Sequence, residues 1–262
     1  MARNILARKC LGAIALAVFL VLPAFFAGAF ASTGRVAQSS TTLAPGVVYT
    51  SYRDSSPRNV IHVTRISAGA RVVIKAVPAA ADGKSGTLSS VASLCARANA
   101  LACVNGDFFD HSGAPLGGEL VDGRWLRQPT PIQQQLWVDT RNRFSFGAMP
   151  AHAVQSLGAT NYAILRPGQA ISIPEHDSFA DWAHARTLVG WDAAGDRFLV
   201  TVEQNKGSSG MSLAQAADLM RGLGATAAVN EDGGGSSQMA VGGHRTGSWS
   251  RAVANIWAVV PA

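Results

Sequence analysis

The residues best suited to chemistry lie in one stretch of the sequence, AAVNEDGGGSSQMAV, which spans residues 227–241. Glycines tolerate positive φ angles and let backbone N–H groups approach a ligand closely, so the run Gly233–Gly235 can form a concave anion site without a helix or a lysine. Ser236 and Ser237 would add hydroxyl donors. A flexible or bulged connection is the alternative, although the apolar residues on both sides indicate that the glycines are held in place.

A second polar turn resembles this one. The segments LCARANALACVNGD (residues 94–107) and LMRGLGATAAVNED (residues 219–232) share a leucine, a ten-residue step to valine, and Asn-x-Asp. Each passes from an apolar helical pattern through a short strand to a polar turn. Chance is one explanation of the similarity. The other is structural equivalence, which would bring Asn105 to Asp107 and Asn230 to Asp232 together at adjacent strand ends.

Several common reaction types are excluded by spacing. No Lys-Ser/Thr pair follows the glycines as it would in a P-loop, and the chain has no G-x-S-x-G nucleophile elbow. The six histidines form no H-E-x-x-H motif, and the cysteines lack the spacing of a zinc site. A serine-hydrolase triad and a catalytic zinc are therefore not expected.

The N-terminus has the order of a secretory signal peptide. Basic residues precede the apolar run LGAIALAVFLVLPAFFAGAF, and an A-x-A sequence ends at Ala31. Such a signal would direct export to the periplasm or the extracellular space, and cleavage after Ala31 would then remove residues 1–31. An uncleaved membrane anchor is the alternative, since the run is long enough to span a bilayer. Residues 32–45 are polar and small, which predicts a linker before a single domain at 46–262.

The mature chain carries little net charge. The whole sequence has 22 basic and 16 acidic residues, and loss of three cations with the signal peptide leaves 19 against 16, or about +3. The sequence contains no block of lysines and arginines of the kind that binds nucleic acid. We therefore expect no nucleic-acid partner.

Cys95 and Cys103 are the two cysteines beyond the signal peptide. Export would place them in an oxidising compartment, where thiols eight positions apart could form a disulfide. Alternatively, both are small buried side chains that remain reduced. The sequence does not choose between these states.

Apolar periodicity predicts a strand-rich domain. The expected elements are strands at 59–66 and 71–77, a helix over 87–100 with Thr87 as its N-cap, and hairpins pairing 135–139 with 143–147 and 186–192 with 197–203. Strands outnumber helices, so the fold class should be α+β, with mixed, strand-rich sheets and a few packing helices. If the two polar turns are equivalent, the domain would contain two pseudo-equivalent halves.

Four segments, in this order, resemble motifs of the phosphodiester glycosidase family. They are VNGDFF (104–109), ARTLVG (185–190), GMSLAQAADLMRGLGATAAVNEDGGGSSQM (210–239) and RAVANIWAV (251–259). The similarity runs from about residue 60 to the C-terminus, and the combination is more specific than any one motif. The resemblance implies hydrolysis of a sugar that is linked through its anomeric carbon to a phosphodiester.

The implied reaction fits the residues of the two turns. Its leaving group is an already acidic phosphate monoester, so stabilising the departing phosphate and the oxocarbenium-like sugar matters more than general-acid help. Arg186 and Arg251 are candidate phosphate clamps, because guanidinium groups match phosphate geometry. Asp107 and Asp232 are candidates for the nucleophile or the water-activating base. The candidate catalytic residues are therefore Asp232, Asp107 and Arg186, and the candidate substrate-binding residues are Asn105, Asn230, Gly233, Gly234, Gly235, Ser236 and Arg251.

Structural roles remain open for most of these candidates. Asp107 could be a turn former, Arg186 and Arg251 could be ion-pair partners, and the asparagines could simply hold the loops by hydrogen bonds to the backbone. Glu231 stands where the family usually has an apolar residue, and it either points to solvent or adds a carboxylate to the site. Glu203 and Lys206 are candidates to replace an acid and a base of a family segment that is longer than the one here.

The expected function is that of a secreted hydrolase acting on sugar-1-phosphodiesters of envelope or exopolysaccharide glycans. No stable membrane insertion is expected after signal cleavage. No cofactor is required, although Asp107, Asp110 and Asp232 together could hold calcium or magnesium. The alternatives are a non-catalytic envelope module that binds anionic glycans and a phosphodiesterase that cleaves the P–O bond.

Overall fold

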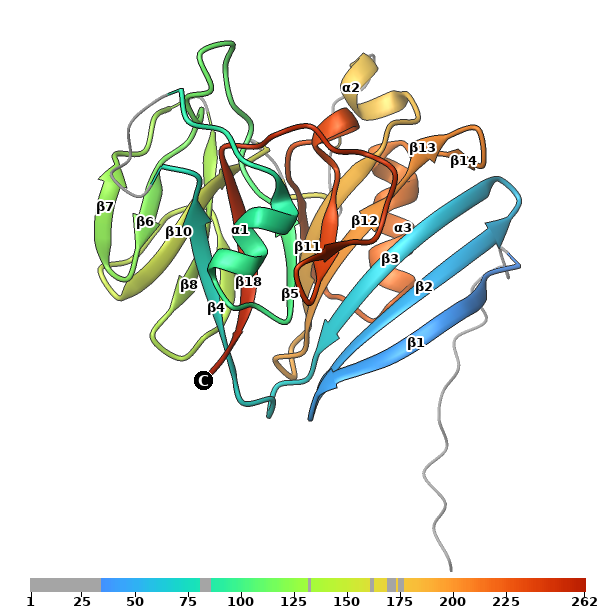
Figure 1. The fold of residues 1–262 in the computed structure, drawn as a ribbon, viewed down its shortest axis with the longest axis horizontal. Helices are drawn as coiled ribbons and strands as arrows, with labels where there is room; N and C mark the ends of the chain where they lie inside the picture. The colour runs from blue at the N-terminus through green and yellow to red at the C-terminus, as the bar shows by residue number, and fades with distance from the viewer. Residues whose placement is uncertain (1–33, 81–85, 132, 161–162, 169–172, 174–176) are drawn as a thin grey trace, which may run out of the picture. The chain divides into compact units, whose positions relative to one another are not determined.

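The structure is a computed structural model, and it describes residues 34–80, 86–131, 133–160, 163–168, 173 and 177–262 (Figure 1). The predicted signal peptide, residues 1–31, lies outside the described residues. Strands dominate the described part, and helices are few, which confirms the α+β class. Every pairing between the described strands is antiparallel, rather than the mixture that the sequence predicts. Within the described part, no helix is both long and apolar enough to cross a membrane.

Three large sheets form the scaffold. Sheet A has the order β1 (Val36–Ala44), β2 (Val47–Ser55), β3 (Arg58–Ile66), β12 (Arg197–Val202), β11 (Arg186–Trp191) and β15 (Ala227–Asn230). Sheet B has the order β17 (His244–Arg245), β16 (Met239–Val241), β5 (Ala102–Asn105), β18 (Asn255–Pro261) and β4 (Val72–Pro78). Sheet C has the order β7 (Arg124–Arg127), β6 (Glu119–Val121), β10 (Ala153–Ala159), β8 (Gln134–Asp139) and β9 (Phe144–Phe146). A short hairpin joins β13 (Gln204–Asn205) to β14 (Ser208–Ser209).

Side chains alternate between two buried faces along the central strands. In β11, Val189 enters the main core cluster while Leu188 enters a second cluster with residues of helix α3 (Leu213–Gly222). In β5, Val104 enters the main cluster while Cys103 packs with residues of helix α1 (Val91–Arg97). A strand with both faces buried reads as a continuous apolar run, as these sequences do. Helices therefore cover the outer faces of sheets A and B.

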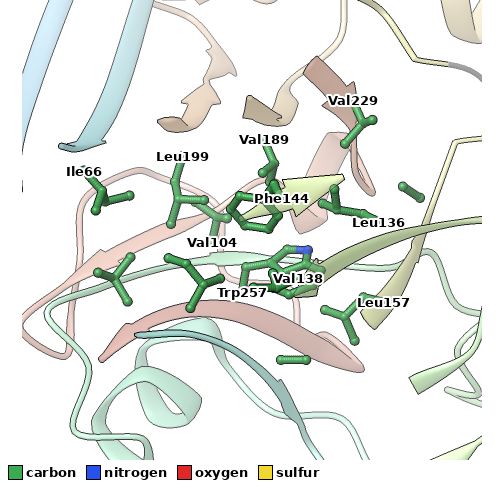
Figure 2. Close-up of a cluster of buried hydrophobic side chains, with 14 of the residues drawn as sticks. Ile66, Val104, Leu136, Val138, Phe144, Leu157, Val189, Leu199, Val229 and Trp257 are labelled. Atoms are coloured by element: carbon green, nitrogen blue, oxygen red, sulfur yellow. The ribbon is translucent and has the colours of Figure 1, made fainter. Parts of the chain in front are cut away.

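The main core cluster draws side chains from all three sheets. Figure 2 draws 14 of its members and labels ten, among them Val189 and Leu199 of sheet A, Val104 and Trp257 of sheet B, and Leu136 of sheet C. Trp257 is fully buried, and its ring meets that of Phe144 edge to face with centroids 5.3 Å apart. Such pairs are worth about 1 kcal/mol beyond the area they bury. This cluster holds the sheets together beneath the ends of β5 and β15.

The first helix begins later than the sequence predicts. Its N-cap is Ser90, whose hydroxyl accepts a hydrogen bond from the Ser93 N–H at 3.1 Å, and not Thr87. The reason is the contact between Ser89 and Val253, which form an antiparallel bridge and hold the chain extended up to Ser90. The two predicted hairpins, by contrast, are present as β8–β9 and β11–β12.

The predicted linker is wrong for residues 36–44, which form β1 at the edge of sheet A. Most of β1 is exposed, so it lacks the apolar alternation that marks a half-buried strand. Its side chains instead form cross-strand hydroxyl contacts with β2: Ser39 lies 3.1 Å from Ser51 and Ser40 lies 3.2 Å from Thr50. The ordered chain therefore extends N-terminal to residue 46.

The similarity between the two polar turns is local. Each segment contains a helix followed by a short strand, α1 with β5 and α3 with β15. The two strands lie in sheets of different size and strand order, so the prediction of two pseudo-equivalent halves is not confirmed.

Cys95 and Cys103 form a disulfide that ties α1 to β5. Both side chains are also fully buried, and of the two sequence-based alternatives the structure shows the disulfide. The bond closes a short loop just before the first polar turn.

Replacing both cysteines with alanine should lower the free energy of unfolding by about 2–3 kcal/mol, because the disulfide restricts the unfolded chain. Urea unfolding followed by circular dichroism would measure the loss. Wild-type protein unfolded in reductant is the control and should match the double variant. An unchanged midpoint, or two free thiols in the oxidised wild type, would contradict the expectation.

Candidate active site

The two polar turns meet at the ends of β5 and β15. The Nδ2 of Asn105 donates to the carbonyl oxygen of Asp232 at 2.8 Å, and the Asp232 N–H donates to the carbonyl oxygen of Gly106 at 3.1 Å. The two turns are therefore in contact, as the sequence predicts if they are equivalent. The strands are not neighbours in one sheet, however, because β5 belongs to sheet B and β15 to sheet A.

Asn105 holds both ends of the segment Asp232–Ser237, which we call the glycine turn. Its Nδ2 reaches Asp232 at the start, and its Oδ1 accepts from the N–H of Gln238 just past the end at 3.1 Å. The same Oδ1 accepts from the Thr187 hydroxyl of β11 at 2.6 Å. With its side chain buried and these bonds made, Asn105 has the loop-holding role that the sequence left open.

At each of the three glycines in the glycine turn, a side chain is disfavoured for a different steric reason. Gly234 has a φ of +59°, in the left-handed region that favours glycine. A Cβ atom on Gly235 would lie 2.9 Å from Nη2 of Arg251, and one on Gly233 would lie 3.1 Å from the carbonyl oxygen of Ala185. The N–H of Gly234 donates to that carbonyl at 2.9 Å. The turn, which includes the 3₁₀ element η1 (Gly234–Ser236), is therefore held on both sides.

Asp232, Ser236 and Arg251 form the polar group at this turn. Asp232 Oδ1 accepts from the Gly233 N–H at 2.8 Å, and the Asp232 carboxylate also bonds to the Ser236 side chain. Arg251 Nη1 lies 3.4 Å from the Ser236 oxygen. Arg251 is exposed and Asp232 is partly exposed. The structure thus brings an acid, a hydroxyl and a guanidinium together where solvent can reach them.

Burial raises the pKa of Asp232, while the bonds from Ser236 and Gly233 and the charge of Arg251 oppose that rise. The raised pKa keeps Asp232 able to exchange a proton at higher pH than an exposed aspartate. A carboxyl group in this setting is suited to act as a base or a nucleophile.

Asp107 lies behind the glycine turn and is almost completely buried. Its Oδ2 accepts from the Gly117 N–H at 2.7 Å, and a Cβ atom on Gly158 would lie 2.7 Å from either carboxylate oxygen. Burial raises its pKa well above the ordinary value, the Gly117 bond opposes this, and the charges of Glu119 and Asp232 add to it. Asp107 is therefore shielded from solvent and is coupled to Asp232 through charge alone.

Sequence reasoning missed Glu119 and Asn255, which complete this buried layer. Asn255 Nδ2 donates to Glu119 at 2.8 Å, and its Oδ1 accepts from the Asp107 N–H at 2.8 Å. Burial raises the pKa of Glu119, while the Asn255 bond and the charge of Arg127 oppose the rise. Asn255 lies within the motif RAVANIWAV, which could have marked it as a candidate. Glu119 lies in no such motif, so the sequence offers no signal for it.

Glu231 points into the protein. Its side chain is fully buried, and Oε1 accepts from the indole N–H of Trp257 at 2.8 Å. Oε2 has no hydrogen-bond partner among the described residues. Burial raises the pKa of Glu231 well above its ordinary value, the Trp257 bond opposes this, and the charges of Asp107 and Asp232 add to it. The solvent-facing alternative is therefore wrong, and the Glu231 carboxylate acts on Asp107 and Asp232 through its charge.

Asn230 is also fully buried. Its carbonyl oxygen accepts from the N–H and the hydroxyl of Thr160 at 3.2 and 3.0 Å, and its Nδ2 donates to the carbonyl of Glu231. These contacts favour a role in holding the end of β15 over direct contact with a substrate.

Arg186 lies at the start of β11 with its side chain fully buried. Nε donates to the carbonyl of Met211 at 2.8 Å, and Nη2 donates to the carbonyls of Phe179 and Trp182 at 2.6 and 3.0 Å. These bonds fasten helix α2 (Ser178–Asp181) and the segment before α3 to sheet A. They favour the structural alternative for Arg186, with carbonyl groups as partners in place of an acid.

Glu203, a candidate to replace a family acid, belongs to a separate polar network. Its Oε1 lies 2.8 Å from His62 Nε2, and its Oε2 accepts from the Ser248 hydroxyl at 2.9 Å. Burial alone would raise its pKa, but the bonds from His62 and Ser248 outweigh burial and lower it. This network ties the segment before Arg251 to sheet A. Lys206 is exposed in the β13–β14 hairpin.

The three aspartates considered for a cation do not form a metal cluster. Asp110 closes its own turn, with Oδ1 accepting from the N–H groups of Ser112 and Ala114 at 2.8 and 3.0 Å. Among the residues that the structure describes, no group of three or more His, Cys, Asp or Glu side chains is arranged to hold a metal ion.

The fold and the site together define a strand-rich α+β protein in which a partly exposed acid and an arginine meet at a glycine turn between two sheets. The chain belongs to the phosphodiester glycosidase family, whose model matches residues 98–260. That match includes both polar turns and Arg251. A search of curated proteins found no match.

Solved structures share the fold. The catalytic domain of zebrafish N-acetylglucosamine-1-phosphodiester alpha-N-acetylglucosaminidase, auto-inhibited by its pro-peptide, is similar with a TM-score of 0.67 and 22% identity, over 87% of this chain and 88% of that one. A hypothetical protein from Synechocystis has a TM-score of 0.63 and 14% identity, over 83% and 62% of the two chains. A putative exported protein from Burkholderia pseudomallei has a TM-score of 0.57 and 18% identity, over 78% and 74%.

Glu231→Gln should make stability less dependent on pH. The folded-state pKa of Glu231 is raised above 4.5, so its contribution to stability is present below pH 4.5 and is lost as the pH rises through the folded-state value. The variant should therefore melt at a higher temperature than the wild type at pH 8, with the difference shrinking towards pH 4.5. Thermal unfolding across this range would measure it.

Asp218→Asn, on the exposed face of α3, is the control and should follow the wild type at every pH. A Glu231→Gln variant that melts at a lower temperature than the wild type at pH 8 would contradict the expectation that burial disfavours the ionised form of Glu231.

Proposed function

We propose that the protein is an exported glycosidase that hydrolyses the bond between the anomeric carbon of a sugar and a phosphodiester in envelope or exopolysaccharide glycans. The observation that carries this proposal is the meeting of Asp232, Ser236 and Arg251 at the glycine turn. Membership of the phosphodiester glycosidase family supports the reaction class. The N-terminal sequence supports export.

Arg251 and the glycine turn would bind the phosphate. The guanidinium lies 2.9 Å from the place that a Cβ atom on Gly235 would occupy, so a phosphate bound at the turn would meet a positive charge and the Ser236 hydroxyl together. Negative charge grows on this phosphate as the glycosidic bond breaks, and donors fixed in advance stabilise that charge without reorganising. The departing phosphate monoester is acidic, so it needs no strong general acid.

Asp232 would act on the sugar side, as the nucleophile or as the base that activates water. It is the least buried of the three coupled acids, and Asp107 and Glu231 lie behind it without exposure to solvent. The raised pKa values of the two inner acids mean that they retain protons at higher pH than exposed acids do. Asp107 and Glu231 would thus limit the negative charge beneath Asp232.

The proposed reaction requires no cofactor. Activity should therefore survive treatment with EDTA. If activity were lost and then restored by calcium or magnesium, the reaction would depend on a divalent cation, which is the possibility that the sequence leaves open.

Asp232→Asn should reduce turnover at least about 100-fold, because the amide can serve neither as base nor as nucleophile. Release of GlcNAc from the methyl diester of GlcNAc-1-phosphate is a suitable assay, and Asp218→Asn is the matched surface control. Reaction in ¹⁸O-water identifies the bond: label in the sugar means C–O cleavage, and label in the phosphate would overturn the glycosidase in favour of a phosphodiesterase.

The same variant separates an enzyme from a binding module. A folded wild type that binds such diesters but releases no sugar, with binding that survives Asp232→Asn, would identify a non-catalytic glycan-binding protein.

Gly235→Ala should weaken phosphate binding, since the new Cβ would lie 2.9 Å from Nη2 of Arg251 and push the guanidinium away. We expect kcat/KM to fall roughly tenfold, as for the loss of one charged hydrogen bond. Gly222→Ala is the matched control, because a Cβ at that position meets nothing within 4 Å. Equal kcat/KM for the two variants would contradict the placement of Arg251 in the site.

A further inference from the structure

A cavity of about 510 Å³ lies at the end of β11 that is remote from the glycine turn. The first residue of β11, Arg186, follows Ala185, whose carbonyl oxygen accepts from the Gly234 N–H. The last residue of the strand, Trp191, lines the cavity. The residue steps between Arg186 and Trp191, at about 3.4 Å each, separate the two ends by roughly 17 Å. The cavity is therefore distinct from the candidate active site, and its volume is in the range of ligand sites.

Aromatic rings form much of the wall of this cavity. Trp191 stacks on Phe144 with ring centroids 5.9 Å apart. Trp137 meets His152 edge to face with centroids 6.1 Å apart. In the described part of the chain, the aliphatic side chains that line the cavity are alanines, so the wall offers little to a fatty acyl chain. Flat aromatic surfaces suit the C–H face of a sugar ring, whose hydroxyls remain free for polar groups.

Two buried donors of this cavity lack a partner. Arg197 is directly opposite Trp191 in the β11–β12 hairpin, so their side chains share one face of sheet A. Nη1 and Nη2 of Arg197 donate to the carbonyl oxygens of Asn142 and Ser67 at 3.1 and 2.9 Å. Its Nε, and the Nε1 of Trp137, have no hydrogen-bond partner among the described residues. Both residues line the cavity, which therefore calls for a ligand that supplies acceptor oxygens.

The charges around the cavity specify the ligand further. Burial lowers the pKa of Arg197, and the charge of Asp196, which opposes this, belongs to an acid already held in another ion pair. Asp139 and Arg143 also line the cavity but pair with each other at 2.7 Å. A bound anion would therefore compensate Arg197. Asp192, another lining residue, accepts from the Asp196 N–H at 2.9 Å, and a carboxylate has acceptor sites left for a hydroxyl.

A second cavity, of about 290 Å³, shares Ser145 and Trp191 with the first. Its lining also includes Phe146 and Arg166, with the guanidinium carbon 5.8 Å from the centroid of the phenylalanine ring. The described residues around this cavity include no acid. The combination of a ring and an arginine is thus repeated next to the first cavity. Such a repeat suits neighbouring units of one chain better than a single small molecule.

We propose that the two cavities form a binding site for a segment of an acidic polysaccharide. The sugar faces would pack on the aromatic rings, the carboxylates would meet Arg197 and Arg166, and a hydroxyl would donate to Asp192. The site takes no part in bond cleavage, so this inference goes beyond the proposed function and does not rest on it. It would let the protein hold a glycan independently of any reaction at the glycine turn.

Calorimetric titration with acidic tetrasaccharides tests the site. The probes are tetragalacturonate, tetramannuronate and a hyaluronan tetrasaccharide, each compared with its methyl ester, which keeps the sugar rings and removes the negative charge. At least one acidic probe should bind, and its methyl ester should bind at least about tenfold more weakly, as for the loss of a hydrogen bond to a charged group.

Arg197→Gln should weaken that binding roughly tenfold, and Trp191→Leu, which removes the aromatic plane, roughly fivefold. Arg166→Ala should weaken it roughly two- to fivefold, because this arginine is exposed. Arg53→Ala, exposed on β2, is the matched control and should bind as the wild type does. Thermal unfolding identifies the folded variants, and Trp191→Leu and Arg166→Ala carry the test if Arg197→Gln does not fold.

Arg251→Ala separates this site from the glycine turn and should leave the binding unchanged. Binding that is lost in Arg251→Ala but kept in Arg197→Gln would place the ligand at the glycine turn and overturn the proposal. Equal binding of acids and esters, or no binding of any probe, would also overturn it.

AMP, which offers a flat ring with a phosphate, is the comparison ligand. Binding of AMP that depends on Arg197, without binding of any tetrasaccharide, would identify a nucleotide site and overturn the glycan. Hydrolysis of the methyl diester of GlcNAc-1-phosphate should be the same in Arg197→Gln and the wild type. Failure of this inference and failure of the proposed function are therefore distinguishable.

Discussion

The candidate site depends on the hydrogen bonds of one asparagine side chain. Asn105, at the end of a strand in sheet B, bonds to the residues on either side of the glycines and to Thr187 of sheet A. A carboxamide can do this because it offers a donor and an acceptor in one plane, which aspartate or leucine does not. The position of Asp232 and of the glycine turn is therefore fixed from the opposite sheet.

Next to these hydrogen bonds lies a layer of buried acids whose hydrogen-bond donors are neutral groups. Asp107 relies on a backbone N–H, Glu119 on Asn255, and Glu231 on the indole of Trp257. Neutral donors compensate a buried carboxylate only partly, so these groups favour their protonated forms. The arginine nearest to the site, Arg251, lies on the solvent side. The site thus combines a positive outer face with a proton-rich interior, which suits a ligand whose negative charge grows during reaction.

The internal similarity offered the meeting of the two polar turns as one of two alternatives, and apolar periodicity predicted the fold class and both hairpins. These features are local or depend on strands with two buried faces, and such patterns are visible in sequence. Roles that depend on distant partners could not be predicted. Arg186 resembles a phosphate ligand in sequence, yet its guanidinium bonds to carbonyls of α2. Glu231 was unexplained because its partner, Trp257, lies 26 positions away on another sheet. Strand β1 was missed because exposed hydroxyl-rich strands lack an apolar period.

The placement of the glycine turn between two sheets has a consequence for how the candidate site comes apart. Asp232 comes from sheet A, whereas the groups that fix it, Asn105 and Gly106, come from the end of a strand in sheet B. Neither sheet contains a working fragment of the site. The candidate site is therefore a property of the docked sheets, and any partly folded form that keeps its strands but loosens this junction would retain its secondary structure and lose the arrangement of the site.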